Sequence, residues 1–163
     1  MLAIDEQALL SARILVVDDG AANVALLEEL LGREGFTQVL GTTQPERCLE
    51  LVQAFQPDLL LLDLWMPGVD GFELLAQLNA PAPGQLPVPV IVLTADATRR
   101  TRHRALGLGA KDFLTKPLDT FEVALRVWNV AETVVLFKRL QSPDFDLRQV
   151  RIVELLGRRI ARL

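Results

Sequence analysis

The sequence has few of the residues on which disulfide-bonded, secreted and membrane proteins depend. It holds one cysteine, Cys48, in 163 residues, which excludes an intrachain disulfide and is typical of the reducing cytosol. No apolar run is long enough to span a membrane, and residues 1–11 carry Asp5 and Glu6 without the basic segment of a signal peptide. We therefore expect a cytoplasmic protein that does not enter the membrane, with Cys48 as a small buried apolar residue.

The chain also has no excess of positive charge and only one histidine. The formal net charge is −4, so the chain lacks the excess of positive charge that favours direct binding of nucleic acid. The lone His103 lies among arginines, and we expect it on the surface rather than in phosphotransfer or metal binding. Half of the 163 residues are hydrophobic, which is enough for one domain with a sizeable core.

Four consecutive leucines, Leu59 to Leu62, lead directly to Asp63. An uninterrupted apolar run that follows the turn at Pro57 and Asp58 predicts a central parallel strand buried on both faces. Ligands of open α/β sheets bind at the carboxyl ends of the strands, so Asp63 is a candidate site residue. Taken alone, an Asp at this place would more often simply open a turn, since Asp is a common turn former.

Three other apolar runs also end in polar residues. Residues 13–17 lead to Asp18 and Asp19, residues 88–93 to Thr94, and residues 110–115 to Lys116. If the strands are neighbours, three carboxylates meet at one edge and raise one another's pKa unless a cation neutralises them. Oxygen ligands of this kind suit Mg²⁺.

Strands alternate with helices over five repeats, which predicts a parallel sheet with helices on both faces. The expected strands are 13–18, 37–41, 58–63, 88–94 and 110–116. The expected helices begin near residues 20–23, 43–44, 72, 97 and 119–120, and the Pro- and Gly-rich residues 79–89 form a loop. Inward-facing residues of the second helix include Leu49, Val52 and Phe55.

The four polar strand ends, with their flanking residues, resemble the signatures of the receiver domain of bacterial two-component response regulators. The matching segments are Val-Val-Asp-Asp at 16–19, Asp-Leu-Trp-Met-Pro-Gly at 63–68, Leu-Thr-Ala at 93–95 and Phe-Leu-Thr-Lys-Pro at 113–117. The resemblance extends from Arg13 to about Gln141. It implies a flavodoxin-like, doubly wound, five-stranded parallel sheet of order 2-1-3-4-5, whose switch point lies beside the three acids.

The resemblance also implies a role for each site residue. Asp63 would accept a phosphoryl group from a sensor histidine kinase or a phosphotransfer protein. The Mg²⁺ ligands would be Asp18, Asp19, Asp63 and the backbone carbonyl of Trp65, while Thr94 and Lys116 would contact the phosphoryl oxygens. A cis Lys116–Pro117 bond is expected. The domain would catalyse its own phosphorylation and dephosphorylation, and would not be an enzyme with a separate substrate.

The same resemblance implies a switch. Thr94 would move toward the phosphoryl group and Phe113 would rotate into the space behind it, changing the face formed by the fourth helix, fifth strand and fifth helix. Gly20, Ala21 and Trp65 depart from the usual residues of the family. Trp65 is bulky for a position two residues after the phosphoacceptor, and we expect it to slow the approach of water.

The last part of the chain is longer than a receiver needs. We divide the sequence into a lead-in (1–12), a receiver core (13–119), an extended fifth helix (120–141) and a terminal amphipathic helix (142–163). Residues spaced as in a coiled coil predict a parallel homodimer through the extended helix: Val123, Val127, Val130, Val134 and Phe137. The alternative is one broad stripe facing the core of the same chain.

Other functions compete with phosphoacceptance. A phosphatase of the haloacid dehalogenase type would need an Asp where Trp65 stands, and a flavodoxin would need a phosphate loop where Asp18 and Asp19 would repel phosphate. A receiver fold used only for docking or dimerisation, independent of phosphorylation, stays open. A second open alternative is that the chain is the amino-terminal part of a longer regulator with a cyclic-dinucleotide output domain.

Overall fold

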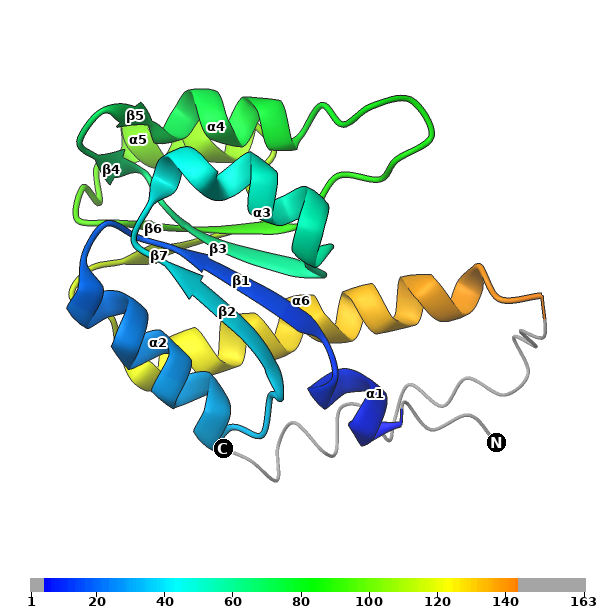
Figure 1. Cartoon of the computed structure of the whole chain (residues 1–163). Helices are drawn as coiled ribbons and strands as arrows, with labels where there is room; N and C mark the ends of the chain where they lie inside the picture. The colour runs from blue at the N-terminus through cyan, green and yellow to red at the C-terminus, as the bar shows by residue number, and fades with distance from the viewer. Residues whose placement is uncertain (1–4, 144–163) are drawn as a thin grey trace.

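Five parallel strands form the centre of the computed structural model, which describes residues 5–143 (Figure 1). They are β1 (Arg13–Val17), β2 (Gln38–Thr42), β3 (Leu59–Asp63), β6 (Val90–Thr94) and β7 (Asp112–Thr115). Their order across the sheet is β2-β1-β3-β6-β7. Counting these five strands along the chain, this is the predicted order 2-1-3-4-5, so the flavodoxin-like fold is confirmed.

Helices cover both faces of the sheet (Figure 1). One face carries α1 (Glu6–Leu10), α2 (Ala21–Arg33) and α6 (Thr120–Leu140). The other carries α3 (Cys48–Phe55), entered through the short 3₁₀ helix η1 (Pro45–Arg47), together with α4 (Gly71–Leu78) and α5 (Arg99–Gly107). None of the helices between residues 5 and 143 combines the length and the apolar character that a membrane span needs.

Successive side chains of each strand point to opposite faces of the sheet, and so they form one hydrophobic core on each face. Ile14 and Val16 of β1 face α2 and α6, whereas Leu15 and Val17 face the helices on the other side, and all four are fully buried. The leucines of β3 divide between the two faces in the same way. A central parallel strand must be apolar on both faces, which is why these segments read as continuous hydrophobic runs.

A small hairpin, absent from our sequence prediction, follows β3. It pairs β4 (Trp65–Met66) with β5 (Val69–Asp70) through a turn in which Gly68 has φ +75°. At Gly71 a Cβ atom would lie 2.5 Å from the carbonyl oxygen of Leu64, so only glycine allows α4 to start this close to the end of β3. The hairpin thereby holds Trp65 beside the end of β3.

Cys48 and His103 lie where the sequence predicts. Cys48 is fully buried, and this burial raises the pKa of its thiol to about 12, as expected for a structural cysteine. His103 is exposed.

Leu49 was predicted to face inward and is instead 42% exposed, because α3 turns Cys48, Val52 and Phe55 toward the sheet.

The length of α6 is confirmed, but part of the predicted dimer seam is wrong. Val123 and Val127 have no exposed surface and pack in the core against the sheet, so neither can contact a partner. Val130 and Val134 are half-buried, and Phe137 is 46% exposed. The buried residues of α6 thus form the broad core-facing stripe that the sequence left open as the alternative. Most of the predicted helix over 142–163 lies outside the described residues.

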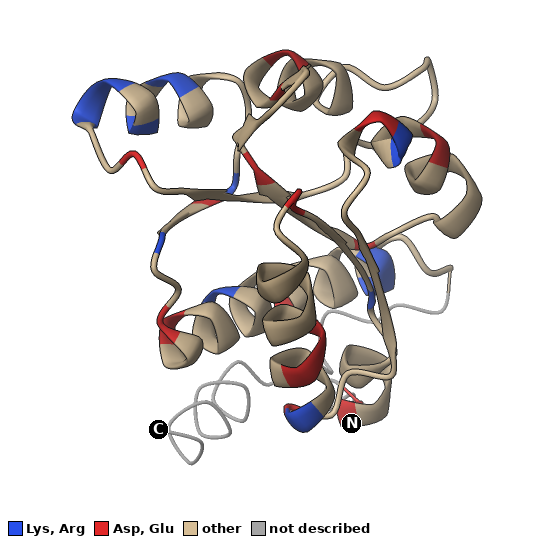
Figure 2. Ribbon diagram, turned by 60° about the vertical axis from the view of Figure 1, so that its left-hand side comes forward, with Lys and Arg blue, Asp and Glu red and all other residues tan. Residues whose placement is uncertain are grey.

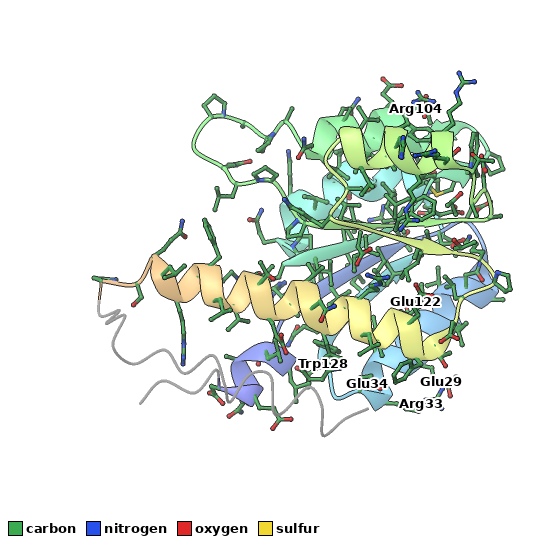
Figure 3. The ribbon with its side chains drawn as sticks, turned by 180° about the vertical axis from the view of Figure 1, so that it is seen from behind. Glu29, Arg33, Glu34, Arg104, Glu122 and Trp128 are labelled. Carbon is green, nitrogen blue, oxygen red and sulfur yellow. The ribbon has the colours of Figure 1, made fainter. Side chains whose placement is uncertain are left out.

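Trp128 anchors the same face of α6. Its indole N–H donates a hydrogen bond of 3.0 Å to Glu34 at the end of α2, and its ring lies 5.0 Å from that of Phe36 (Figure 3). Trp128 is buried apart from 8% of its surface. The polar tip of a buried Trp needs such an acceptor, and here the bond joins α6 to α2.

Helix α5 is unusually basic, as the blue helix in Figure 2 shows. It carries four exposed arginines, and none of them forms an ion pair with a carboxylate in the part of the chain that the structure describes: Arg99, Arg100, Arg102 and Arg104. Two of them lie in the first turn, where the helix dipole disfavours positive charge. The guanidinium of Arg104 instead lies 3.9 Å from the ring centroid of Phe72, and that of Arg102 lies 5.8 Å from the centroid of Phe113.

We expect Val127→Ala to reduce the free energy of unfolding by about 2 kcal/mol, because it removes two buried methyl groups and leaves a cavity. Phe137→Ala on the same helix should change it by less than roughly 0.5 kcal/mol, since that side chain is half exposed. Urea denaturation of both variants measures the difference. Equal effects at the two positions would contradict the assignment of Val127 to the core.

Candidate functional site

Three carboxylates gather where β1 and β3 end. Oxygen atoms of Asp18, Asp19 and Asp63 all lie within 4.8 Å of one another. Asp18 is fully buried and Asp63 is 3% exposed, whereas Asp19 is open to solvent. The strand order makes this possible, because β1 and β3 are adjacent and parallel and so end at the same edge.

The ammonium group of Lys116 bridges the two buried acids. Its Nζ lies 2.7 Å from Oδ2 of Asp18 and 3.1 Å from Oδ2 of Asp63. Lys116 follows β7, which is two strands away from β3, and the next peptide bond, Lys116–Pro117, is cis as expected. The structure therefore brings the predicted lysine to the predicted acids.

Backbone amides orient the other oxygen of each buried acid. Oδ1 of Asp18 accepts a 2.8 Å hydrogen bond from the N–H of Gly20 and a longer one, 3.4 Å, from the side-chain amide of Asn23. Oδ1 of Asp63 accepts a 3.2 Å bond from the N–H of Trp65. Each acid is thus held between a local turn and Lys116. The sequence predicted the acids but not these partners.

The pKa of the Asp63 carboxyl is raised above its ordinary value, mainly because burial disfavours its charged form. The nearby charge of Asp18 raises it further, whereas the Trp65 amide and Lys116 oppose the shift. Burial by itself lowers the pKa of Lys116, but its hydrogen bond and charge interaction with Asp18, together with Asp63, raise that pKa above the ordinary value. Lys116 therefore stays charged at neutral pH.

The charges of the site do not balance. Three carboxylates and one ammonium leave two negative charges when all four groups are ionised. The donors are all oxygen atoms, one of the acids is exposed, and the spacing allows one cation to reach all three. These residues therefore fit a hard divalent cation such as Mg²⁺, which prefers oxygen ligands and keeps several waters.

Thr94 and Phe113, the predicted switch residues, are both buried. The hydroxyl oxygen of Thr94 accepts a 3.0 Å hydrogen bond from the N–H of Asp96 in the loop before α5. Phe113 is 7% exposed and packs in the core on the α4 and α5 side of the sheet. Trp65, by contrast, is 54% exposed beside the carboxylates, and its ring meets that of Phe72 edge-on at 5.8 Å.

The profile of the response regulator receiver domain matches residues 14–127. This chain belongs to that family. Response regulator PleD of Caulobacter vibrioides is 36% identical over 144 residues, which make up 88% of this chain and 31% of that protein. The Bacillus subtilis regulatory protein PhoP, named for alkaline phosphatase synthesis, is 36% identical over 139 residues, covering 85% of this chain and 55% of that protein. The chain thus spans 31% of one of these two relatives and 55% of the other.

Solved receiver domains share the fold. The receiver domain of the Francisella response regulator 1452 matches with a TM-score of 0.68 and 25% identity, over 75% of this chain and 98% of that one. A receiver domain of a putative Luxo repressor from Vibrio parahaemolyticus matches with a TM-score of 0.73 over 80% of this chain and 98% of that chain, at 22% identity. These solved receiver domains match over nearly their whole length, which agrees with the fold described above.

We expect Lys116→Met to destabilise the receiver by roughly 3 kcal/mol at neutral pH, because it leaves Asp18 and Asp63 buried without their counter-ion. The loss should shrink in acid as Asp63, whose pKa is raised, takes up a proton. It should also shrink when Mg²⁺ replaces the missing charge.

Thermal unfolding from pH 4 to 8, with and without Mg²⁺, measures this. Lys138→Met is the matched control, because Lys138 pairs with Asp58 at an exposed position far from the three acids. A pH-independent loss that Mg²⁺ leaves unchanged would contradict a charge-balance role for Lys116.

Proposed function

We propose that this receiver takes up a phosphoryl group on Asp63 from a sensor histidine kinase or a phosphotransfer protein and so acts as a phosphorylation switch in two-component signalling. The observation that carries the proposal is the geometry of Lys116, which binds Asp18 and Asp63 together. The proposal is supported by this fixed positive charge, because the oxygens of a transferred phosphoryl group would need one beside Asp63. A purely structural ion pair would not require a third, exposed acid at the same place.

In this proposal a carboxylate oxygen of Asp63 attacks the phosphorus of a phosphohistidine. A new P–O bond forms, the P–N bond breaks, and the leaving imidazole keeps the electron pair and takes a proton. The Trp65 amide bonded to one oxygen of Asp63 fixes the direction of the attack. Lys116 moves its donors from the carboxylates to the phosphoryl oxygens, and the hydroxyl of Thr94 donates to a second one.

Asp18, Asp19 and Asp63 would hold Mg²⁺, with the backbone carbonyl of Trp65 as a further ligand. When bound, the ion neutralises the repulsion between the attacking carboxylate and the phosphoryl group. Asp19 is the exposed member of the set and provides the side from which the cation enters. The removal of the group by water at the same site would make the signal temporary.

The switch in this proposal starts from Thr94. Its hydroxyl now accepts a bond from the Asp96 amide and would turn away to donate to the phosphoryl group. Asp96 also accepts a 2.6 Å bond from Thr101 in the first turn of α5, so a change in this loop reaches α5. Phe113 would then rotate into the space beside Thr94. The two arrangements are alternative packings between which phosphorylation shifts the population.

A docking or dimerisation module is the second candidate. It is supported by the exposed Phe137 and Leu140 near the end of α6, whose exposed fractions are 46% and 55%. Any homodimer through α6 would use this end of the helix rather than Val123 and Val127. This chain covers only part of the length of its relatives. For the whole protein we therefore propose a longer regulator in which this receiver is joined to an output domain.

Acetyl phosphate and Mg²⁺ test the proposed function directly. We expect the wild type to gain one acid-labile phosphoryl group, detected by intact mass, and to bind beryllium fluoride with a rise in melting temperature. Asp63→Asn should do neither, and chelation of Mg²⁺ should abolish both. Light scattering of the same samples reports any change in molar mass. Phosphorylation at another residue, or a complete lack of phosphorylation, would contradict the proposal and favour the docking module.

We expect Trp65→Asn to shorten the lifetime of the phosphoaspartate by about tenfold, because an exposed indole beside Asp63 hinders the approach of water. A tenfold change in the rate of hydrolysis corresponds to about 1.4 kcal/mol in its activation free energy. Trp65→Phe keeps an aromatic ring at this position and should have a smaller effect. Loss of the phosphoryl group after removal of acetyl phosphate gives the rates, and equal rates for all three proteins would refute the shielding role.

A further inference from the structure

Helix α6 has a second stripe of residues, on the side that faces away from the sheet. We call it the outer flank and define it as Leu125, Asn129, Leu136 and Leu140, whose spacing places them on one side of the helix. Two residues turn a helix by about 200°, so Leu125 and Asn129 point away from Val127, which packs against the sheet. Leu136 also touches the edge of the core, and Leu140 is 55% exposed.

Asn129 leaves a polar atom of the outer flank without a partner. Its side-chain oxygen Oδ1 is buried, and no group of residues 5–143 donates a hydrogen bond to it. The hydroxyl of Thr133 donates instead to the backbone carbonyl of Asn129, at 3.0 Å. A buried amide oxygen without a donor is costly. The flank therefore fits an occupant that brings apolar side chains together with N–H donors.

The same side of the molecule is acidic. Helices α1, α2 and α6, with their capping residues, carry eight acidic and four basic residues. Figure 3 shows three of these acids, Glu29, Glu34 and Glu122, on the side where α2 lies beside α6. An occupant with an excess of positive charge is therefore favoured.

Residues 146–163 of this chain, which lie outside the described residues, have a sequence with these properties. At helical spacing their apolar side chains fall on one face: Val150, Val153, Leu156, Ile160 and Leu163. Their arginines fall on the opposite face: Arg148, Arg151, Arg158, Arg159 and Arg162. Residues 144–163 hold five arginines and three acids, so they complement the acidic side in charge, and the guanidinium groups offer many N–H donors.

The connection to α6 favours contact within one chain. Helix α6 ends at Leu140, and Pro143 cannot continue it. Two helices joined by two to five residues pack as antiparallel neighbours, and residues 141–145 are a connection of this length. A helix over residues 146–163 would be about 27 Å long, beside about 31 Å for α6. It is therefore long enough to reach from Leu140 back to Leu125.

We propose that residues 146–163 fold back along α6 as an antiparallel helix and cover the outer flank. This intramolecular cover keeps Leu136 and Leu140 from contacting a second copy of the chain or another protein, and its release makes them available. The contact does not depend on phosphoryl transfer, so it can fail while the proposed function stands, and the reverse.

Thiol labelling of the whole 163-residue chain tests the cover without Mg²⁺ or a phosphoryl donor. Asn129→Cys places a reporter on the outer flank, and its reaction with iodoacetamide is followed by intact mass. Cys48 is fully buried with a pKa of about 12, so it adds little background. We expect Leu156→Gln to raise the labelling rate about tenfold, because burial of one leucine side chain stabilises a contact by at least that factor. Ile160→Gln should act in the same direction.

Two matched controls accompany these variants. Val134→Cys places a second reporter about 140° around α6 from Asn129, at a position that is also half-buried, and its rate should not respond to Leu156→Gln. Arg158→Gln makes the same new side chain on the arginine face and should change the rate at Asn129→Cys by less than about twofold. If Asn129→Cys fails to fold, Leu125→Cys reports on the same flank.

Four results would overturn the proposal. They are a rate at Asn129→Cys that neither Leu156→Gln nor Ile160→Gln changes, an equal rise at Val134→Cys, an equal effect of Arg158→Gln, and labelling as fast as that of a free thiol in the unsubstituted background. Light scattering gives a further check. Protection that grows with protein concentration, together with the molar mass of a dimer, would assign the cover to a second copy and refute the contact within one chain.

Discussion

The ammonium group of Lys116 holds two buried carboxylates that would otherwise repel each other, and the arrangement of the sheet edge depends on it. Burial alone makes ionised Asp18 and Asp63 costly, and their mutual repulsion adds to that cost. Lys116 offsets both, from a strand two positions away in the sheet. One long side chain therefore ties β7 to β1 and β3 at the point where the chemistry would occur. The two charges that remain uncompensated make the same place receptive to a cation.

Much of the fold and the identity of the site residues could be predicted because parallel sheets impose strong local rules. Each buried strand is a continuous apolar run, and the residue that ends it falls at a known edge, so Asp18, Asp63, Thr94 and Lys116 could be placed together from sequence. What the sequence did not predict is that Lys116 contacts both buried acids. This contact joins β7 to β1 and β3, and no local sequence pattern indicates it. The amide donors at Gly20 and Trp65 depend on turn geometry that the residue types do not determine.

The errors have a common physical cause. Period-seven spacing in α6 was read as a dimer seam, yet a helix that covers a sheet uses the same spacing to bury its own face, and Val123 and Val127 do so. Leu49 was wrongly predicted because the buried face of α3 passes through Cys48, Val52 and Phe55, which leaves Leu49 beside it and 42% exposed. The helix α6 is further tied to the sheet by Arg126, 3.2 Å from Asp112 of β7, and by Lys138 with Asp58 before β3. Its orientation is set within the protomer.

The arginines of α5 give this helix an unusual response to ionic strength. Four like charges within nine residues repel one another, and the pair in the first turn also opposes the helix dipole. Dissolved salt screens both effects over about 10 Å at 0.1 M, so the electrostatic cost of forming α5 falls as salt rises, whereas the ion pairs at Asp112 and Asp58 weaken. The two sides of the sheet therefore respond to salt in opposite senses.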